Sequence, residues 1–149
     1  MNLKYMDIAF EEAKKSFHQN EVPIGAVLVK NDKIIAKSHN NKEKKCCCLC
    51  HAELNVIKKA SKKLKNWRLD DCEIYVTLDP CPMCASAIKQ ARISKVYSAC
   101  SNSDKNNWEI ISNIFLGDKT NPEVKISTNL AENESKLLLN EFFKLKRRK

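Results

Sequence analysis

Two short segments, His51-Ala52-Glu53 and Pro80-Cys81-Pro82-Met83-Cys84, restrict the fold of this chain more than any other feature. Each lies where a loop enters a predicted helix. Cys81 and Cys84 are three positions apart, so both thiolates can reach one ion at a helix start, where the helix dipole favours the thiolate form. His51 would supply a third, nitrogen ligand. A fold that builds a site from both segments must therefore bring two helix starts together.

Two cysteines and one histidine form a donor set typical of catalytic zinc, because a tetrahedral ion then keeps one position open. That position holds water, whose pKa the ion lowers towards about 7. Glu53 can stand beside this water and carry its proton without being a ligand. A lone CxxC could instead be a redox pair or a structural zinc knuckle, and a lone HxE occurs by chance. The combination, with Pro80 and Pro82, is far more specific.

The spacing of apolar residues predicts an α/β layered domain with a partly parallel sheet, since helices alternate with strands after a first hairpin. The expected strands are residues 22–29 and 33–37, paired around Asn31-Asp32, and then 73–78, 95–99 and 123–127. The expected helices are residues 3–17, 53–64, 82 to about 90, 108–115 and 131 to about 146. With 149 residues the chain is predicted to be one domain, residues 1–149, in which only the basic tail, about 144–149, frays.

The composition indicates in which compartment the protein acts and which class of partner it binds. We find neither a signal-peptide pattern nor an apolar run long enough for a membrane span, which predicts a soluble, cytoplasmic protein. Thiols stay reduced there, so the eight cysteines indicate metal binding or catalysis before disulfides. The net charge of +9 suggests a polyanion such as nucleic acid. Compositional drift is the alternative, because most of the positive charge is lysine and only two glycines occur.

The HxE and PCxxC patterns together are the signature of zinc-dependent nucleobase deaminases. Beyond that signature, the chain resembles the bacterial tRNA-specific adenosine deaminases over nearly its whole length. The matching segments are Glu21–Val29, Asn40, Tyr75–Ala85, Ala91–Ile93 and Glu141–Arg147. The resemblance implies a three-layer α/β/α cytidine-deaminase-like fold and a homodimer. It also implies zinc-dependent deamination of the wobble adenosine to inosine in a tRNA anticodon loop.

The resemblance also implies a role for individual residues. His51, Cys81 and Cys84 would hold zinc, Glu53 would carry the proton, Asn40 would hydrogen-bond the flipped nucleoside, and Val22 and Pro23 would lie near the base. Phe142, Phe143 and the region from Lys144 to Arg147 would contact the anticodon stem-loop, which suits stacking of bases on aromatic rings and pairing of phosphates with Lys and Arg. An ordinary amphipathic helix would instead use Phe142 and Phe143 to cap the core.

The chain departs from the family pattern in two places. Cys46-Cys47-Cys48-Leu49-Cys50 replaces a stretch close to His-Asp-Pro-Thr-Ala. Further on, Asn102 and Asn106 are expected where the family has an aspartate and a glycine. Cys50 as a fourth zinc ligand would close the site, and adjacent loop residues rarely aim at one ion. A tolerated cysteine-rich loop is the leading interpretation, and an auxiliary metal or redox site is the alternative; Cys72 and Cys100 are predicted to be small buried residues.

Two other functions remain open from the sequence. A deaminase of a free base or nucleotide, such as guanine or dCMP, would share the PCPMC segment. A zinc-stabilised RNA-binding subunit without catalysis would also use the ligands, but it would have no use for Glu53. The basic tail and the Glu21–Val29 segment favour the tRNA enzyme.

Overall fold

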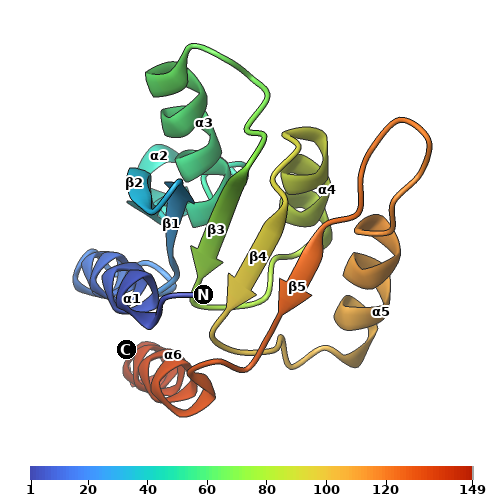
Figure 1. Cartoon of the computed structure of the whole chain (residues 1–149). Coiled ribbons are helices and arrows are strands. Elements are labelled where there is room, and N and C mark those ends of the chain that lie inside the picture. Colours follow the sequence, from blue (N-terminus) through green and yellow to red (C-terminus); the bar gives the residue numbers. More distant parts are fainter. Residues whose placement is uncertain (149) are drawn as a thin grey trace.

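The structure, a computed structural model, describes residues 1–148 and contains a five-stranded sheet flanked by helices (Figure 1). The strands are β1 (Gly25–Lys30), β2 (Lys33–His39), β3 (Cys72–Val76), β4 (Lys95–Ser98) and β5 (Lys125–Ser127). The helices are α1 (Leu3–His18), α2 (Lys42–Lys45), α3 (Ala52–Leu64), α4 (Pro82–Gln90), α5 (Lys105–Ile114) and α6 (Glu132–Arg147).

The sheet has the order β2-β1-β3-β4-β5 and mixes both kinds of pairing. β1 pairs antiparallel with β2 and with β3, whereas β3, β4 and β5 run parallel. The first pairing is the predicted hairpin, in which Asn31 and Asp32 both have positive φ, 51° and 59°. Such a two-residue turn matches the natural twist of a hairpin. The prediction of a mixed, partly parallel sheet is confirmed.

Helices cover both faces of the sheet, which confirms the three-layer prediction (Figure 1). On one face α1 and α6 pack against the sheet through residues such as Met6, Phe10, Tyr75 and Leu138. On the other face α3, α4 and α5 contribute to a second cluster of buried apolar side chains. Its members include Leu28, Val56, Ile74, Ile88 and Ile111. Apolar side chains fill both layers because a central strand is buried on both sides, with several aromatic rings in the first cluster and mostly aliphatic side chains in the second.

Gly25 is placed where α1 lies directly against β1. A Cβ atom at this position would collide with the Ala9 carbonyl oxygen and would lie 2.6 Å from the Ala13 nitrogen. These are backbone atoms of a packed helix and cannot move aside cheaply. One of the chain's two glycines is therefore fixed by the packing of α1 against the sheet.

The four-residue helix α2 was not predicted, because it contains no apolar residue to give a helical pattern. Residues 144–147 continue α6, close to the predicted helix end at about residue 146, and the Lys146 ammonium lies 5.5 Å from the centre of the Phe142 ring. Fraying of the tail stays a prediction. Lys149 lies outside the described residues. Within residues 1–148, no helix combines the length and the apolar character that crossing a membrane requires.

Candidate active site

The two chemical motifs meet because of the sheet topology. β2 and β3 are both antiparallel to β1, so they run in the same direction and their carboxyl ends lie at one edge of the sheet. The chain leaves β2 for α2 and then α3, and it leaves β3 for α4. His51 is the N-cap residue of α3 and Cys81 is the N-cap residue of α4. Both helix starts therefore meet at the edge where ligands bind in open α/β sheets.

The His51 ring nitrogen Nδ1 lies 3.8 Å from the Cys81 sulfur and 3.5 Å from the Cys84 sulfur. The three donor atoms lie within 4.8 Å of one another, and within residues 1–148 no other group of three or more such side chains is as close. Tetrahedral zinc with its ordinary bond lengths separates its sulfur and nitrogen ligands by about 3.5–3.8 Å. The donor set and its spacing therefore fit a zinc ion.

The electrostatics of the two thiols also fit a cation. A hydrogen bond from the Cys84 thiol, followed by one from His51, lowers the pKa of Cys81 to about 4 in spite of burial. The same contact with Cys81, together with burial, raises the pKa of Cys84. Two thiolates this close repel each other, so one of them holds its proton. A divalent ion between them would offset that repulsion and bind both as thiolates.

Glu53 lies in the first turn of α3 and is 4% exposed, and it lines a cavity together with His51. It is not a member of the three-ligand group. Burial raises the pKa of its carboxyl to about 7. The structure thus places a carboxyl group beside the three potential ligands, as the sequence predicted.

The cavity beside Glu53 has a volume of about 170 Å³ and brings several predicted site residues together. Its lining residues are Val22, Ile24, Asn40, Lys42, His51, Ala52 and Glu53. Pro23, which the resemblance placed near the base, is buried and does not line the cavity. Ile24 and Lys42 were missed, since neither belongs to a motif whose chemistry could single it out.

Asn40 is held rigidly at the wall of this cavity. Its side-chain Nδ2 donates to the Val22 carbonyl at 3.1 Å, and its Oδ1 accepts from the Lys42 N–H at 3.2 Å. The Ser16 hydroxyl donates to the Asn40 carbonyl at 2.6 Å. An asparagine amide offers two donors and two acceptor sites, so each end of Asn40 keeps capacity for a ligand.

Buried polar residues that sequence reasoning missed support both halves of the site. The Glu21 carboxylate accepts from the Glu43 and Lys44 N–H groups at 3.0 and 2.8 Å and so fixes the start of α2. The Asn107 side chain of α5 donates to the Pro80 carbonyl at 3.2 Å, directly behind Cys81. No local pattern marks these residues, because their partners are far away in the sequence.

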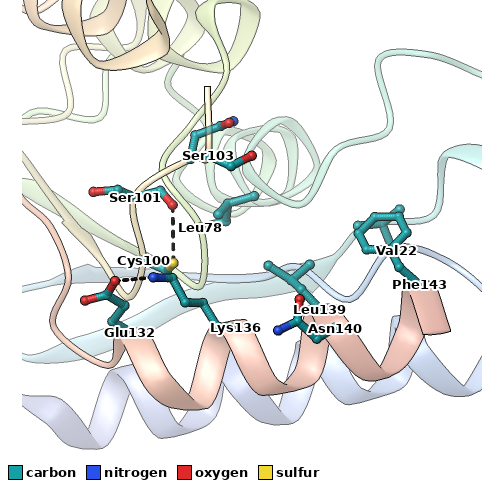
Figure 2. A pocket seen from close by; sticks show the side chains of 11 residues that line it. Val22, Leu78, Cys100, Ser101, Ser103, Glu132, Lys136, Leu139, Asn140 and Phe143 are labelled. Atoms are coloured by element: carbon teal, nitrogen blue, oxygen red, sulfur yellow. Dashed lines mark hydrogen bonds and ion pairs between the residues drawn. The ribbon is translucent and has the colours of Figure 1, made fainter. Parts of the chain in front are cut away.

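A second, larger cavity of about 500 Å³ shares Val22 with the first (Figure 2). It lies between α6, which presents Glu132, Lys136, Asn140 and Phe143, and the loop after β4. That loop contributes residues 100–103, including Asn102. A cavity next to the site is therefore bounded by the helix that carries the basic tail.

The structure separates the two adjacent phenylalanines of α6. Phe142 is 5% exposed and packs 6.1 Å from Phe17, ring centre to ring centre, which confirms that it caps the core. Phe143 is 46% exposed and lines the larger cavity. The basic side chains of residues 144 and 146–148 are all exposed. The end of α6 thus presents one aromatic ring and several positive charges to solvent.

The cysteine-rich loop lies beside the site without joining it. Cys46 and Cys48 are exposed, Cys47 and Cys50 are partly buried, and none of them belongs to the ligand group around His51. Cys72 and Cys100 are buried, which confirms their prediction as small core residues.

A three-layer fold with a His-Cys-Cys cluster and a buried glutamate at two helix starts defines a zinc-dependent deaminase. The sequence profile of the MafB19-like deaminases matches residues 1–147. The tRNA-specific adenosine deaminase of Bacillus subtilis (strain 168) is 39% identical over 145 residues, which covers 97% of this chain and 90% of that protein. The chain belongs to this deaminase family and groups with its tRNA-specific adenosine deaminases.

Solved structures agree with the sequence relatives. A structure from a study of A-to-I editing by tRNA:A34 deaminases at the wobble position has a TM-score of 0.85 and 36% identity, and covers 93% of this chain and 100% of its own. The guanine deaminase of Bacillus subtilis has a TM-score of 0.66 and 35% identity, and covers 74% of this chain and 71% of its own. The match to the A34 deaminase is the more complete of the two.

Proposed function

We propose that this protein deaminates adenosine at the wobble position of a tRNA anticodon to inosine. The observation that carries the proposal is the cluster of His51, Cys81 and Cys84 next to a cavity that contains the buried Glu53 carboxyl. Relatives named as tRNA-specific adenosine deaminases, similar along nearly the whole chain, support tRNA as the substrate. The overall reaction adds water to adenosine and releases ammonia.

His51, Cys81 and Cys84 would hold the zinc ion, and Glu53 would move protons. When bound there, zinc acts as a Lewis acid that makes water nucleophilic at neutral pH. The Glu53 carboxylate lies beside this position and would take one proton from the attacking water and deliver it to the ring nitrogen N1. It would then move the remaining proton, from the new hydroxyl on C6, to the departing amino group, which leaves as ammonia. Its burial excludes competing water from the proton path.

Substrate placement would depend on the two cavities. The small cavity would take the flipped base, with Val22 against it, and Asn40 would hydrogen-bond the nucleoside through its remaining amide capacity. A partner for the ribose 2′-hydroxyl lets a protein tell RNA from DNA. The larger cavity, with Phe143, would receive part of the anticodon loop, and the basic end of α6 would contact phosphates of the stem.

We further propose that the protein acts in the cytoplasm as a homodimer. In support of a dimer, α5 and the residues after it expose large apolar side chains: Trp108 at 43%, Ile110 at 45% and Leu116 at 62%. Apolar surface of this kind is typical of contacts between proteins. Sedimentation velocity of the full chain would test the dimer, since a monomer at micromolar concentration would contradict it.

The test of the function is incubation with an in vitro transcribed tRNA that carries adenosine at position 34, followed by sequencing for inosine. We expect inosine at that position and no other. Free adenosine, guanine and dCMP serve as parallel substrates, and release of ammonia from guanine or dCMP alone would establish the alternative class of deaminase. Zinc binding without any deamination would instead favour a non-catalytic subunit.

A further inference from the structure

The loop between α2 and α3 contains a second CxxC pair that the deaminase chemistry does not use. Cys47 and Cys50 lie at the two ends of a tight turn, in which the Cys50 N–H donates to the Cys47 carbonyl at 3.2 Å. A turn of this kind brings the first and fourth Cα atoms within about 7 Å of each other. Disulfides span Cα separations of about 4.4–6.8 Å. The backbone therefore already holds these two residues near bonding distance.

The four cysteines of the loop differ in exposure, and Cys47 and Cys50 are the two that are partly buried. The other two cysteines of the loop are arranged differently. Cys46 adopts a left-handed conformation, with φ of 52°, and its thiol donates to the Glu43 carbonyl at 3.6 Å. Cys48 lies inside the turn and is exposed.

The same geometry argues against a metal site in this loop. A structural or catalytic ion needs three or four converging ligands. Among residues 1–148, the three-ligand groups that are close enough do not include any cysteine of the loop. Two thiols without a third ligand are the arrangement of a dithiol that can be oxidised.

We propose that Cys47 and Cys50 form a reversible disulfide by exchange with small-molecule disulfides. One thiol attacks the small disulfide, forms a mixed disulfide and releases the first small thiol. The second cysteine then attacks the mixed disulfide, forms the Cys47–Cys50 bond and releases the second small thiol, and each leaving sulfur takes up one of the two cysteine protons. The protein loses two electrons, and the small disulfide gains them.

The bond would form without disturbing the metal ligands. Closure keeps the turn that already exists, and the Cys50 carbonyl stays bonded to the Asn41 N–H at 3.1 Å on the side of the loop that leads to His51. In the holoenzyme Cys81 and Cys84 bind zinc and are withdrawn from exchange. Oxidation is therefore expected at the loop and not at the site.

The test uses the zinc-loaded full chain in buffers of oxidised and reduced glutathione, followed by alkylation of free thiols and tryptic digestion. Trypsin places the four loop cysteines in peptide 46–58 and Cys81 and Cys84 in peptide 69–89, so the two regions are read separately. We expect peptide 46–58 to lose two alkylatable thiols, with fragment ions that locate the bond between Cys47 and Cys50. Dithiothreitol should restore all four, and zinc content should not change.

A matched pair of variants isolates the cysteines concerned. The double variant Cys46→Ser/Cys48→Ser keeps only Cys47 and Cys50 in the loop and should still lose two thiols. With Cys47→Ser added, no disulfide bond within the peptide should form, and any loss at Cys50 should be a mixed disulfide with glutathione. Four free thiols in oxidising buffer, a bond between other cysteines, or a second zinc ion bound by the reduced loop would each overturn the proposal.

Discussion

The chain carries the spacing CxxC twice, at Cys47–Cys50 and at Cys81–Cys84, in surroundings that give the two pairs different chemistry. The second pair begins a nine-residue helix, faces His51 and is partly or fully buried. The first pair spans a turn at the surface, next to a four-residue helix, and among residues 1–148 it belongs to no group of three converging ligands. The CxxC spacing alone therefore only permits metal binding. A pair becomes a metal site when it also lies at a helix start and a third donor converges on it.

The largest effect that would sharpen this comparison is the loss of one ligand from the buried pair. Cys84→Ser should reduce zinc from one ion per chain towards none and abolish deamination, because a hydroxyl is a far poorer zinc ligand than a thiolate. Metal analysis by inductively coupled plasma spectrometry measures this directly. The matched variant Cys50→Ser should retain its zinc, and loss of zinc in that variant would contradict the assignment of the ligands.

The next effect separates the proton carrier from the metal. Glu53→Ala should keep its zinc and its fold while turnover falls by roughly 10²–10⁴-fold, the usual contribution of general acid–base catalysis. Inosine formation under single-turnover conditions gives the rate. Glu43→Ala removes an exposed carboxylate next to the other CxxC pair and should leave the rate unchanged. A Glu53→Ala rate above about a tenth of the wild-type value would exclude the catalytic role.

A smaller effect, on zinc affinity, is expected from a substitution of a residue that supports the metal ligands. Asn107→Ala removes the hydrogen bond to the Pro80 carbonyl that holds the approach to Cys81. Loss of such supporting interactions typically weakens metal affinity by roughly 10–100-fold. Competition with a chromogenic chelator measures the zinc affinity. The neighbouring Asn106 is exposed, so Asn106→Ala is the control, and equal affinities in the two variants would remove Asn107 from the metal site.

A change at the end of α6 should affect tRNA binding and leave both cysteine pairs unchanged. Lys144→Gln/Arg147→Gln removes two exposed positive charges, so tRNA binding should weaken several-fold. The slope of log affinity against log salt should fall by about 0.7 for each phosphate that the variant no longer neutralises. Filter binding at several salt concentrations measures both quantities. Lys62→Gln/Lys63→Gln, at the end of α3 remote from the site, is matched in charge. Identical slopes for the two variants would mean that the basic end of α6 does not contact RNA, and its charge would then be explained by compositional drift.

The smallest effect is expected when the surface pair is removed altogether. The variant with Cys46, Cys47, Cys48 and Cys50 all changed to Ser should bind one zinc ion and deaminate at the wild-type rate, since these residues lie outside the ligand group. Each surface substitution should change the free energy of unfolding by no more than about 0.5 kcal/mol. Urea denaturation and metal analysis check both statements. A loss of zinc would place the loop inside the metal site.

The sequence predicted the elements well where an apolar period or a motif was present. α1, α3 and α4 and the strands of the sheet were found within a few residues of their bounds, and Asn31-Asp32 located the hairpin turn. It failed at α2, whose residues Lys42–Lys45 contain no apolar side chain. The predicted end of the last helix, at about residue 146, agrees with α6, which ends at Arg147.

By itself, the sequence determined the chemistry available to this protein, because ligand type, ligand spacing and a nearby carboxylate are local properties of His51–Glu53 and Cys81–Cys84. Only the tertiary structure decided how these groups meet. The shared direction of β2 and β3 brings the two helix starts to one edge of the sheet, and burial makes Glu53 a carboxyl group with a raised pKa. The tertiary structure also places Lys42, but not Pro23, in the wall of the cavity, and it places the Asn107 side chain on the Pro80 carbonyl. Such interactions join residues far apart in the chain, so no local pattern records them.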